Sequence, residues 1–304
     1  MKVFVTGASG FVGEEILRQL QHAGHSIRIL ARNPQLARVQ AIAAKYSAEV
    51  HPGDVLDVAS LPNGLKGVDA IIHLVGIISE LGRNTFESVH TLGTENLLVA
   101  AGTSGVKRLV HMSALGTRLN ARSCYHRSKW AAEEFVRLSG LDYTIFRPSI
   151  IYGSGDHFVN LFEKMSRFSP ILPVMGAGKS KMQPVPVADV ATCFVRALTE
   201  PKSIGQTFDL CGDEVLSFNQ ILETILEVTE RERFLLHIPW FLARWQAAAL
   251  ESVFPWLLGV APPLNRDQLI MLGEDNVGNP QPANDLFQLK PIPFRDGIAA
   301  YLKR

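Results

Sequence analysis

A glycine-rich turn between an expected strand and an expected helix constrains this chain more than any other feature. The sequence begins KVFVTGASGFVGEEILRQL, in which an apolar strand at residues 3–5 precedes the glycines and apolar residues recur at helical spacing after them. Gly7 permits the tight turn, Gly10 lets the backbone approach a pyrophosphate, and Gly13 lets the helix pack closely on the strand. Because the helix N-terminus offers free N–H groups to phosphates, the segment predicts a dinucleotide site. The residues assigned to it are Gly7, Ser9, Gly10, Phe11, Val12 and Gly13.

The end of the second expected strand favours NADP(H) over NAD(H). A dinucleotide fold that prefers NAD usually places an acidic residue after this strand, where it binds the ribose 2′-hydroxyl. Here residues 27–30 form the expected strand, and Ala31 and Arg32 follow it. Arg32 can pair with a 2′-phosphate through a charge-assisted contact. The alternative is that Arg32 only ends the strand in solvent.

Strands alternate with helices through the first two thirds of the chain. Further apolar strands are expected to end near Val50, to span residues 70–74, and to lie in VKRLVHMSA and YTIFRPSIIYG. This alternation implies right-handed crossovers, so we predict an α/β fold with a doubly wound parallel Rossmann sheet and a small C-terminal α/β lobe. Ligands of such sheets lie along the carboxyl ends of the strands. The further cofactor-binding residues predicted there are Asp54, Val55, Leu74, Val75, Gly76, Lys129 and Pro148.

Tyr125 and Lys129 form the candidate catalytic pair. They stand four residues apart in SCYHRSKW, so on a helix their side chains share one face. A nearby ammonium favours the phenolate, and we expect Lys129 to lower the tyrosine pKa from its usual value of about 10. Lys129 is also expected to bind the nicotinamide ribose, while Tyr125 exchanges a proton with a substrate hydroxyl or carbonyl as a hydride moves. Ser113, which ends the preceding strand, is the third candidate catalytic residue.

Together these motifs resemble the short-chain dehydrogenase/reductase superfamily, in its extended or atypical branch. The elements that carry the resemblance over almost the whole chain are TGASGFVG, GDVLD, HLVG, HTLGTENLL, VHMSALG, YHRSK and FRPSIIYG. The resemblance implies a nicotinamide dinucleotide on the three glycines, with Tyr125 as the catalytic tyrosine and Lys129 as its lysine. The segments HLVGIISELGRNTFESVH, SPILPVMGAGKSKMQPV and RDQLIMLGEDNVGNP are similar to bacterial relatives of the nucleotide-binding accessory subunit of respiratory complex I. That similarity implies NADPH held without turnover.

The sequence departs from the superfamily pattern at two positions. The usual catalytic serine or threonine aligns with Ala114, so that Ser113 becomes its neighbour and Thr117 a candidate substitute. His90 stands where the family usually has asparagine, either keeping a hydrogen-bonding role or lying as a satisfied core histidine. Loss of one polarising donor at such a site can cost roughly 10²-fold in rate. A second hypothesis is therefore that the protein is a weak enzyme, or a binding protein without activity.

The expected Rossmann domain covers residues 1–152 and 186–212, and the smaller substrate or partner lobe covers residues 153–185 and 213–304. Asp189 is expected to cap a helix that runs to about residue 198 and returns the chain to the Rossmann domain. Ser217 and Gln220 have capping-box spacing at the start of a second helix. Lys179 and Lys181 lie in a loop that either touches a substrate phosphate or is simply solvated.

The segment IPWFLARWQAAALESVFPWLLGV predicts an unusually apolar helix over about residues 239–258. It holds Trp240, Trp245 and Trp256, and its only charged residues, Arg244 and Glu251, share a narrow stripe because seven residues make nearly two turns. Pro239 suits the first helical turn. The helix is expected either to be buried in the second lobe or to dock on a membrane interface or a protein partner.

Composition excludes several classes of protein. The formal net charge of +1 gives no field for nucleic acid, and 47% hydrophobic with 19% charged residues is typical of a packed globular chain. Three scattered cysteines form neither a disulfide framework nor a metal site, and no apolar run is long enough to suggest a membrane span. We therefore expect a cytoplasmic protein, either free or peripheral to the inner membrane. Its expected partners are a dinucleotide and an unidentified small-molecule substrate. The sequence favours an NADP(H)-dependent oxidoreductase or a nucleotide-sugar epimerase or dehydratase. The alternative is a structural or sensing NADPH-binding protein.

Overall fold

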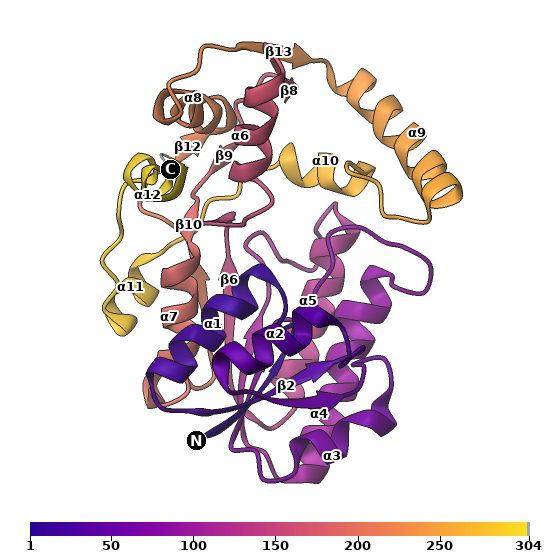
Figure 1. The fold of residues 1–304 in the computed structure, drawn as a ribbon, viewed down its shortest axis with the longest axis vertical. Helices are drawn as coiled ribbons and strands as arrows, with labels where there is room; N and C mark the ends of the chain where they lie inside the picture. Colours follow the sequence, from indigo (N-terminus) through magenta and orange to yellow (C-terminus); the bar gives the residue numbers. More distant parts are fainter. Residues whose placement is uncertain (303–304) are drawn as a thin grey trace.

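A seven-stranded parallel sheet forms the centre of the lower half of the molecule (Figure 1). The computed structural model describes residues 1–302. The sheet order is β11-β6-β5-β4-β1-β2-β3, which confirms the predicted doubly wound sheet. Its strands are β1 (Lys2–Thr6), β2 (Ser26–Ala31), β3 (Glu49–Pro52), β4 (Ala70–His73), β5 (Arg108–Met112), β6 (Asp142–Pro148) and β11 (Gln206–Leu210).

The direction of winding reverses beside β1. This strand pairs with β2 on one side and with β4 on the other, so Thr6 lies opposite both Leu30 and His73. The turn after β1, the end of β2 and the loop after β4 therefore meet at one edge of the sheet. Doubly wound sheets bind their ligands at this reversal point.

Helices cover both faces of the sheet and bury two apolar clusters against it. Helices α1 (Phe11–His22), α2 (Ala37–Tyr46), α7 (Val187–Ala197) and α11 (Gln281–Phe287) pack on one face, and α3 (Leu61–Leu65), α4 (Gly93–Ser104) and α5 (Cys124–Leu138) on the other. Three short non-α helices are η1 (Val58–Ser60), η2 (Glu87–Leu92) and η3 (Pro201–Ser203). The expected cap at Asp189 was wrong, because α7 begins at Val187 after the extended residue Pro186 and Asp189 lies inside its first turn.

A second lobe lies above the Rossmann sheet. Its core joins α6 (Val159–Phe168), α8 (Phe218–Val228) and α12 (Phe294–Leu302). Ser217 and Gln220 form the predicted capping box at the start of α8. The domain boundaries stay a prediction, since α11 follows β11 yet packs Ala283 and Phe287 into the Rossmann core. Two-stranded pairings complete the lobe and its junction: β7 (Ile151–Tyr152) with β10 (Val185–Pro186), β8 (Ile171–Met175) with β13 (Phe234–Ile238), and β9 (Lys181–Met182) with β12 (Leu216–Ser217).

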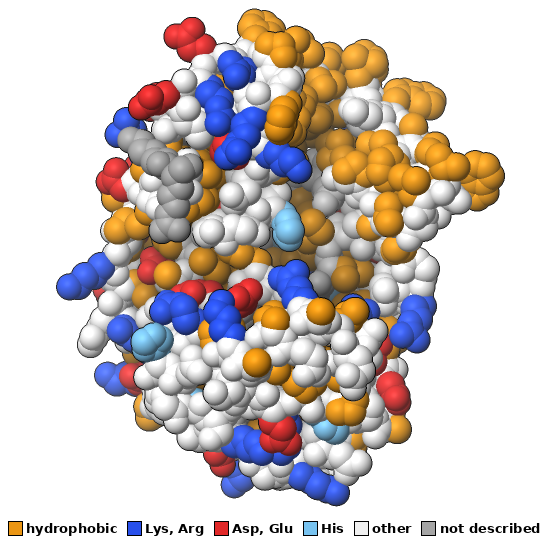
Figure 2. All heavy atoms as spheres, in the orientation of Figure 1, with side chains coloured by type: hydrophobic (Ala, Val, Ile, Leu, Met, Phe, Trp, Pro, Cys, Tyr) orange, Lys and Arg blue, Asp and Glu red, His pale blue; other side chains and the backbone are white. Residues whose placement is uncertain are grey.

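The apolar segment forms α9 (Trp240–Leu258), which extends along the outer edge of the second lobe and leads to α10 (Arg266–Leu272) (Figure 1). Only Ala243 and Ala247 of α9 are buried, while Trp245 is 76% exposed and Trp256 is 85% exposed. Of the two expected arrangements, burial in the second lobe is therefore wrong. Figure 2 shows hydrophobic side chains gathered over this edge, with Lys and Arg side chains beside those at the top of the lobe. Among residues 1–302, no helix has both the length and the apolar character to cross a bilayer.

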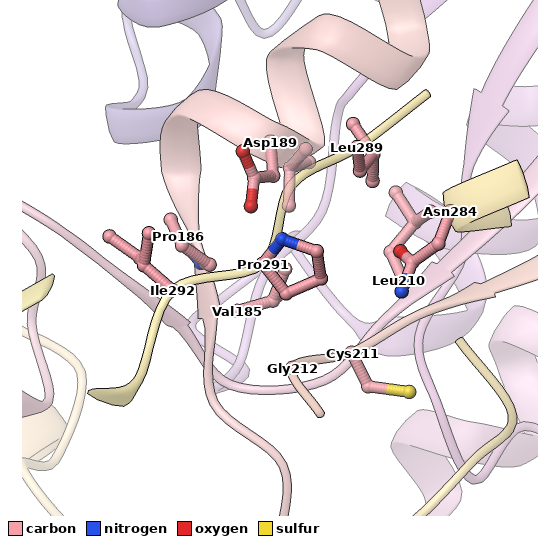
Figure 3. A pocket seen from close by; sticks show the side chains of 11 residues that line it. Val185, Pro186, Asp189, Leu210, Cys211, Gly212, Asn284, Leu289, Pro291 and Ile292 are labelled. Atoms are coloured by element: carbon pink, nitrogen blue, oxygen red, sulfur yellow. The ribbon is translucent and has the colours of Figure 1, made fainter. Parts of the chain in front are cut away.

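A small enclosed cavity lies beneath the start of α7, at the junction with the C-terminal segment (Figure 3). Asp189 lines it together with apolar side chains such as Leu289 and Ile292. Burial raises the pKa of Asp189 to about 6. The folded state thus holds this proton more tightly than the unfolded state does. As the pH rises through the interval from about 4 to 6, ionisation of Asp189 must destabilise the fold.

We expect Asp189→Asn to stabilise the protein at pH 8 and to have little effect at pH 4. The gain at pH 8 should be about 1 kcal/mol, since the half-buried carboxylate is partly screened by solvent. Urea unfolding of wild type and variant at both pH values measures it, with the exposed Asp285→Asn as a control expected to stay within about 0.5 kcal/mol. An equal gain at both pH values would contradict the assigned titration.

Candidate functional site

The glycine turn after β1 has the geometry that a pyrophosphate requires. Gly7 has a φ of +76°, in the left-handed region, and a Cβ on Gly13 would collide with the carbonyl oxygens of Gly7 and Ala8. A Cβ on Gly10 would lie 3.3 Å from the Gly7 carbonyl oxygen, a tight contact, so a side chain here would crowd the turn. Gly10 is also the N-cap of α1 and supplies no side-chain acceptor, which leaves amide donors available at the helix end. The turn therefore fits a dinucleotide.

The other predicted cofactor residues surround this turn unevenly. Ser9 is exposed and Phe11 half-buried at its mouth, whereas Val12 packs into the core. Leu74 is buried behind Gly7, its backbone carbonyl carbon 3.0 Å from where a Gly7 Cβ would lie. Two more predicted positions, Val75 and Gly76, follow Leu74 in the exposed or half-buried loop after β4. Farther along the sheet edge, Pro148 is buried at the end of β6, and its carbonyl oxygen accepts a hydrogen bond from the Leu115 amide at 2.9 Å.

Arg32 and Asp54 lie together beyond the ends of β2 and β3. Both line a cavity of about 300 Å³ after β2 and β3. Val55, the next residue, is buried, and its carbonyl oxygen accepts a hydrogen bond from Asn96. The structure therefore brings the predicted 2′-phosphate residue and the predicted adenine-side residues into one place.

Helix α5 is held in a fixed rotation by a buried ion pair. Tyr125, Lys129 and Glu133 are each four residues apart and share one face. Glu133 is fully buried and accepts from Arg147 on β6 at 2.6 and 2.8 Å and from Arg137 at 2.6 Å. Because the carboxylate is anchored to the sheet, the same face turns Tyr125 and Lys129 toward the strand ends.

Lys129 is 2% exposed at the carboxyl end of β5. Its Nζ donates to the Met112 carbonyl oxygen at 3.1 Å. A Cβ on Gly76 would lie 3.2 Å from the Lys129 Nζ. Burial lowers the pKa of Lys129 to about 8. The ammonium is thus close to losing its proton near neutral pH, and a side chain at position 76 would press on it.

Tyr125 lies in an aromatic enclosure one turn earlier on α5. Its ring packs edge-on against Phe86, His90 and His126, with centroid distances of 5.2–5.8 Å. Burial raises the pKa of Tyr125 to about 12, opposite in direction to the lowering that we expected from Lys129. The phenol is therefore protonated at neutral pH, as a proton donor must be.

His90 combines the two roles considered for it. It is buried in the π-helical turn η2, where its Nε2 accepts from the Ile77 amide at 3.0 Å. Its Nδ1 lies 2.8 Å from the Ser128 hydroxyl, which donates to the Tyr125 carbonyl oxygen at 2.8 Å. Burial lowers the His90 pKa to about 2, so the ring is neutral and donates from Nδ1. This chain joins the loop after β4 to the first turn of α5.

The hydroxyl expected to complete the pair is displaced. Ser113 is buried, and its hydroxyl lies 3.4 Å from that of Thr117, while its amide donates to the Phe146 carbonyl oxygen at 2.7 Å. Ala114 offers no side-chain donor. The predicted role of Ser113 therefore stays a prediction, with Thr117 as its immediate partner.

Asp267 is a site residue that the sequence did not reveal. It comes from α10, and its carboxylate accepts from the Cys124 amide at 2.7 Å and the Tyr125 amide at 3.0 Å. A neighbour, Asn265, donates to the Ile78 carbonyl oxygen at 3.1 Å. The connection from α9 thus ends on the first turn of α5. Since these partners lie more than 140 residues apart, no local spacing could have signalled the contact.

Comparison with known proteins decides the family. A model of the NAD dependent epimerase/dehydratase family matches residues 3–211. The chain belongs to this family. It is accordingly a nicotinamide-dinucleotide-binding protein of the short-chain dehydrogenase/reductase type, which confirms the resemblance seen in the motifs.

Relatives of this epimerase/dehydratase family member have diverse names. It is 28% identical over 280 residues to the mitochondrial NADH dehydrogenase [ubiquinone] 1 alpha subcomplex subunit 9 of Arabidopsis thaliana, covering 90% of this chain and 70% of that protein. It is 32% identical over 200 residues to a ceramide reductase of Caulobacter vibrioides, covering 66% and 61%. Its fold matches a Thermotoga maritima UDP-glucose 4-epimerase with a TM-score of 0.78 at 18% identity, over 100% of this chain and 98% of that one.

Proposed function

We propose that this protein is an NADP(H)-dependent oxidoreductase that reduces the carbonyl group of a hydrophobic substrate. One observation carries the proposal: a protonated, enclosed Tyr125 lies one helical turn from the buried Lys129, on the face of α5 that is anchored toward the nucleotide turn. Tyr125 donates its proton to the carbonyl oxygen, and the product is an alcohol. When bound, the nicotinamide supplies the hydride and is oxidised.

Lys129 and His90 act by positioning in this proposal. Lys129 presents its ammonium at the end of β5, where it can bind ribose hydroxyls and return a proton to Tyr125. His90 fixes the Ile77 amide and, through Ser128, the backbone of Tyr125. Ser113 or Thr117 is left to polarise the substrate oxygen in place of Ala114.

The exposed face of α9 supports a substrate delivered from a membrane. Trp245 and Trp256 are eleven residues apart, about three turns, so both point away from the buried Ala243 side. The sole ionic side chains of α9 are Arg244 and Glu251, and Glu251 accepts from Arg266 at 2.6 Å. Tryptophan-rich helices of this kind lie in bilayer interfaces. We infer attachment to the inner membrane from the cytoplasm. The relative named as a ceramide reductase favours a lipid ketone as substrate.

Ala114 favours a second function, that of a protein that holds NADPH without turnover. The residue leaves the site without the usual side-chain donor beside Tyr125, and one relative is named as a subunit of NADH dehydrogenase. In that case Tyr125 and Lys129 only bind the nucleotide, and α9 is its docking surface. Nucleotide binding is common to both functions, so turnover of a ketone separates them.

We expect NADPH to raise the melting temperature more than NADH does at equal concentration. Arg32 is exposed at the cavity near Asp54, where it can neutralise a 2′-phosphate. A tenfold difference in affinity, with ligand in excess, corresponds to about 1.4 kcal/mol and a difference of about 2–4 °C for a chain of this size. Differential scanning fluorimetry measures it, and Arg32→Ala should reduce the difference. A larger shift with NADH would exclude the assigned preference.

A further inference from the structure

A second arginine faces the cavity that holds Arg32. The cavity of about 300 Å³ is lined by Arg32, Gly53, Asp54, Leu56, Asp57 and Arg83. Arg83 belongs to the loop after β4, far in sequence from Arg32. Two strand-end loops on either side of β1 thus present one guanidinium each to the same space.

The backbone of the loop fixes where Arg83 lies. Leu81 and Asn84 exchange backbone hydrogen bonds at 3.0 and 3.1 Å, which makes a tight turn with Gly82 and Arg83 at its tip. Gly82 has a φ of +57°, and the Arg83 carbonyl oxygen accepts from Ser88 at 2.9 Å. The tip is therefore defined, while the Arg83 side chain itself remains exposed.

The Arg83 guanidinium rests on Asp54 without exhausting its donors. Its Nη2 lies 3.3 Å from Asp54 Oδ2, a long contact that uses one of five N–H groups. Backbone amides already serve the acidic lining residues, since Asp54 Oδ1 accepts from Leu56 and Asp57 Oδ1 from Ala59. Within residues 1–302, Arg32 forms no ion pair. Both guanidinium groups can thus turn toward an added anion.

We propose that Arg83 is a specificity-determining residue that binds the 2′-phosphate of NADP(H) together with Arg32. The inference rests on the NADP(H) preference of the proposed function. A phosphate between two guanidinium groups receives charge-assisted hydrogen bonds from both, and Asp54 is left free for the adenine side. A ribose 2′-hydroxyl offers no charge to Arg83, so NADH gains little from it.

Titration calorimetry of the full chain with NADPH and NADH tests the assignment. We expect Arg83→Ala and Arg83→Gln to weaken NADPH binding about tenfold and to change NADH binding less than about twofold. Arg83→Lys should recover part of the loss. Arg18→Ala is the matched control, because Arg18 also pairs with a carboxylate but lies on α1. The fragments 2′,5′-ADP and 5′-AMP, which differ by the phosphate, should reproduce the difference.

The outcomes separate this inference from the proposed function. Equal losses for NADPH and NADH would overturn it, because Arg83 would then act on adenine through Asp54. An unchanged NADPH affinity in both Arg83 variants would also overturn the role of Arg83. If the wild-type protein still prefers NADPH over NADH in that experiment, the proposed function stands. A wild type that binds the two nucleotides equally would sink both.

Discussion

Replacing Tyr125 with phenylalanine will lower ketone reduction by about 10³-fold and leave NADPH affinity within about twofold of wild type. The change removes one oxygen from a ring whose aromatic contacts with Phe86, His90 and His126 can all persist. Only the proton donor is lost. NADPH consumption with a ketone derivative of ceramide as probe measures the rate, and calorimetry measures binding.

A control variant and the activity of the wild-type protein determine how this result is interpreted. Tyr143→Phe makes the same chemical change on β6, away from the nucleotide turn, and should keep turnover within about twofold. Turnover of Tyr125→Phe at the wild-type rate would reject the assigned proton transfer. If the wild type binds NADPH and reduces no ketone probe, the binding function favoured by Ala114 replaces the oxidoreductase.

Local sequence patterns were sufficient for the Rossmann half of the molecule. The glycine turn and the strand alternation depend on residues close in sequence, where steric rules act directly. In the second lobe, the capping box at Ser217 is equally local. The face shared by Tyr125 and Lys129 is equally local. These features were predictable because a few neighbouring residues determine each of them.

Properties that depend on burial or on distant contacts were not predictable. The Tyr125 pKa is raised, since enclosure by Phe86 and His90 outweighs an ammonium one turn away. The contact of Asp267 in α10 with α5 and that of Arg83 with Asp54 join segments far apart in sequence, which only the fold brings together. For α9, residues that are apolar on every side usually indicate a buried helix, and nothing in the segment itself reveals that one face stays uncovered.

The exposed face of α9 leads to the second large effect, the loss of lipid binding in Trp245→Glu/Trp256→Glu. We expect wild type to float with vesicles of phosphatidylcholine and phosphatidylglycerol and the double variant to bind at least about 10²-fold more weakly. Inserting each tryptophan contributes roughly 2 kcal/mol, and each glutamate adds repulsion from anionic headgroups. Because both side chains are largely exposed, the free energy of unfolding should change by less than about 0.5 kcal/mol.

The control for lipid binding is Leu138→Glu, which places the same charge on an exposed apolar residue at the end of α5. It should float like wild type. Wild type that stays with the unbound fraction would exclude a bilayer and leave a protein partner as the occupant of this face. If flotation is confirmed, the route from α9 through Arg266 and Asp267 to the first turn of α5 places the membrane-bound helix next to the residue that donates the proton.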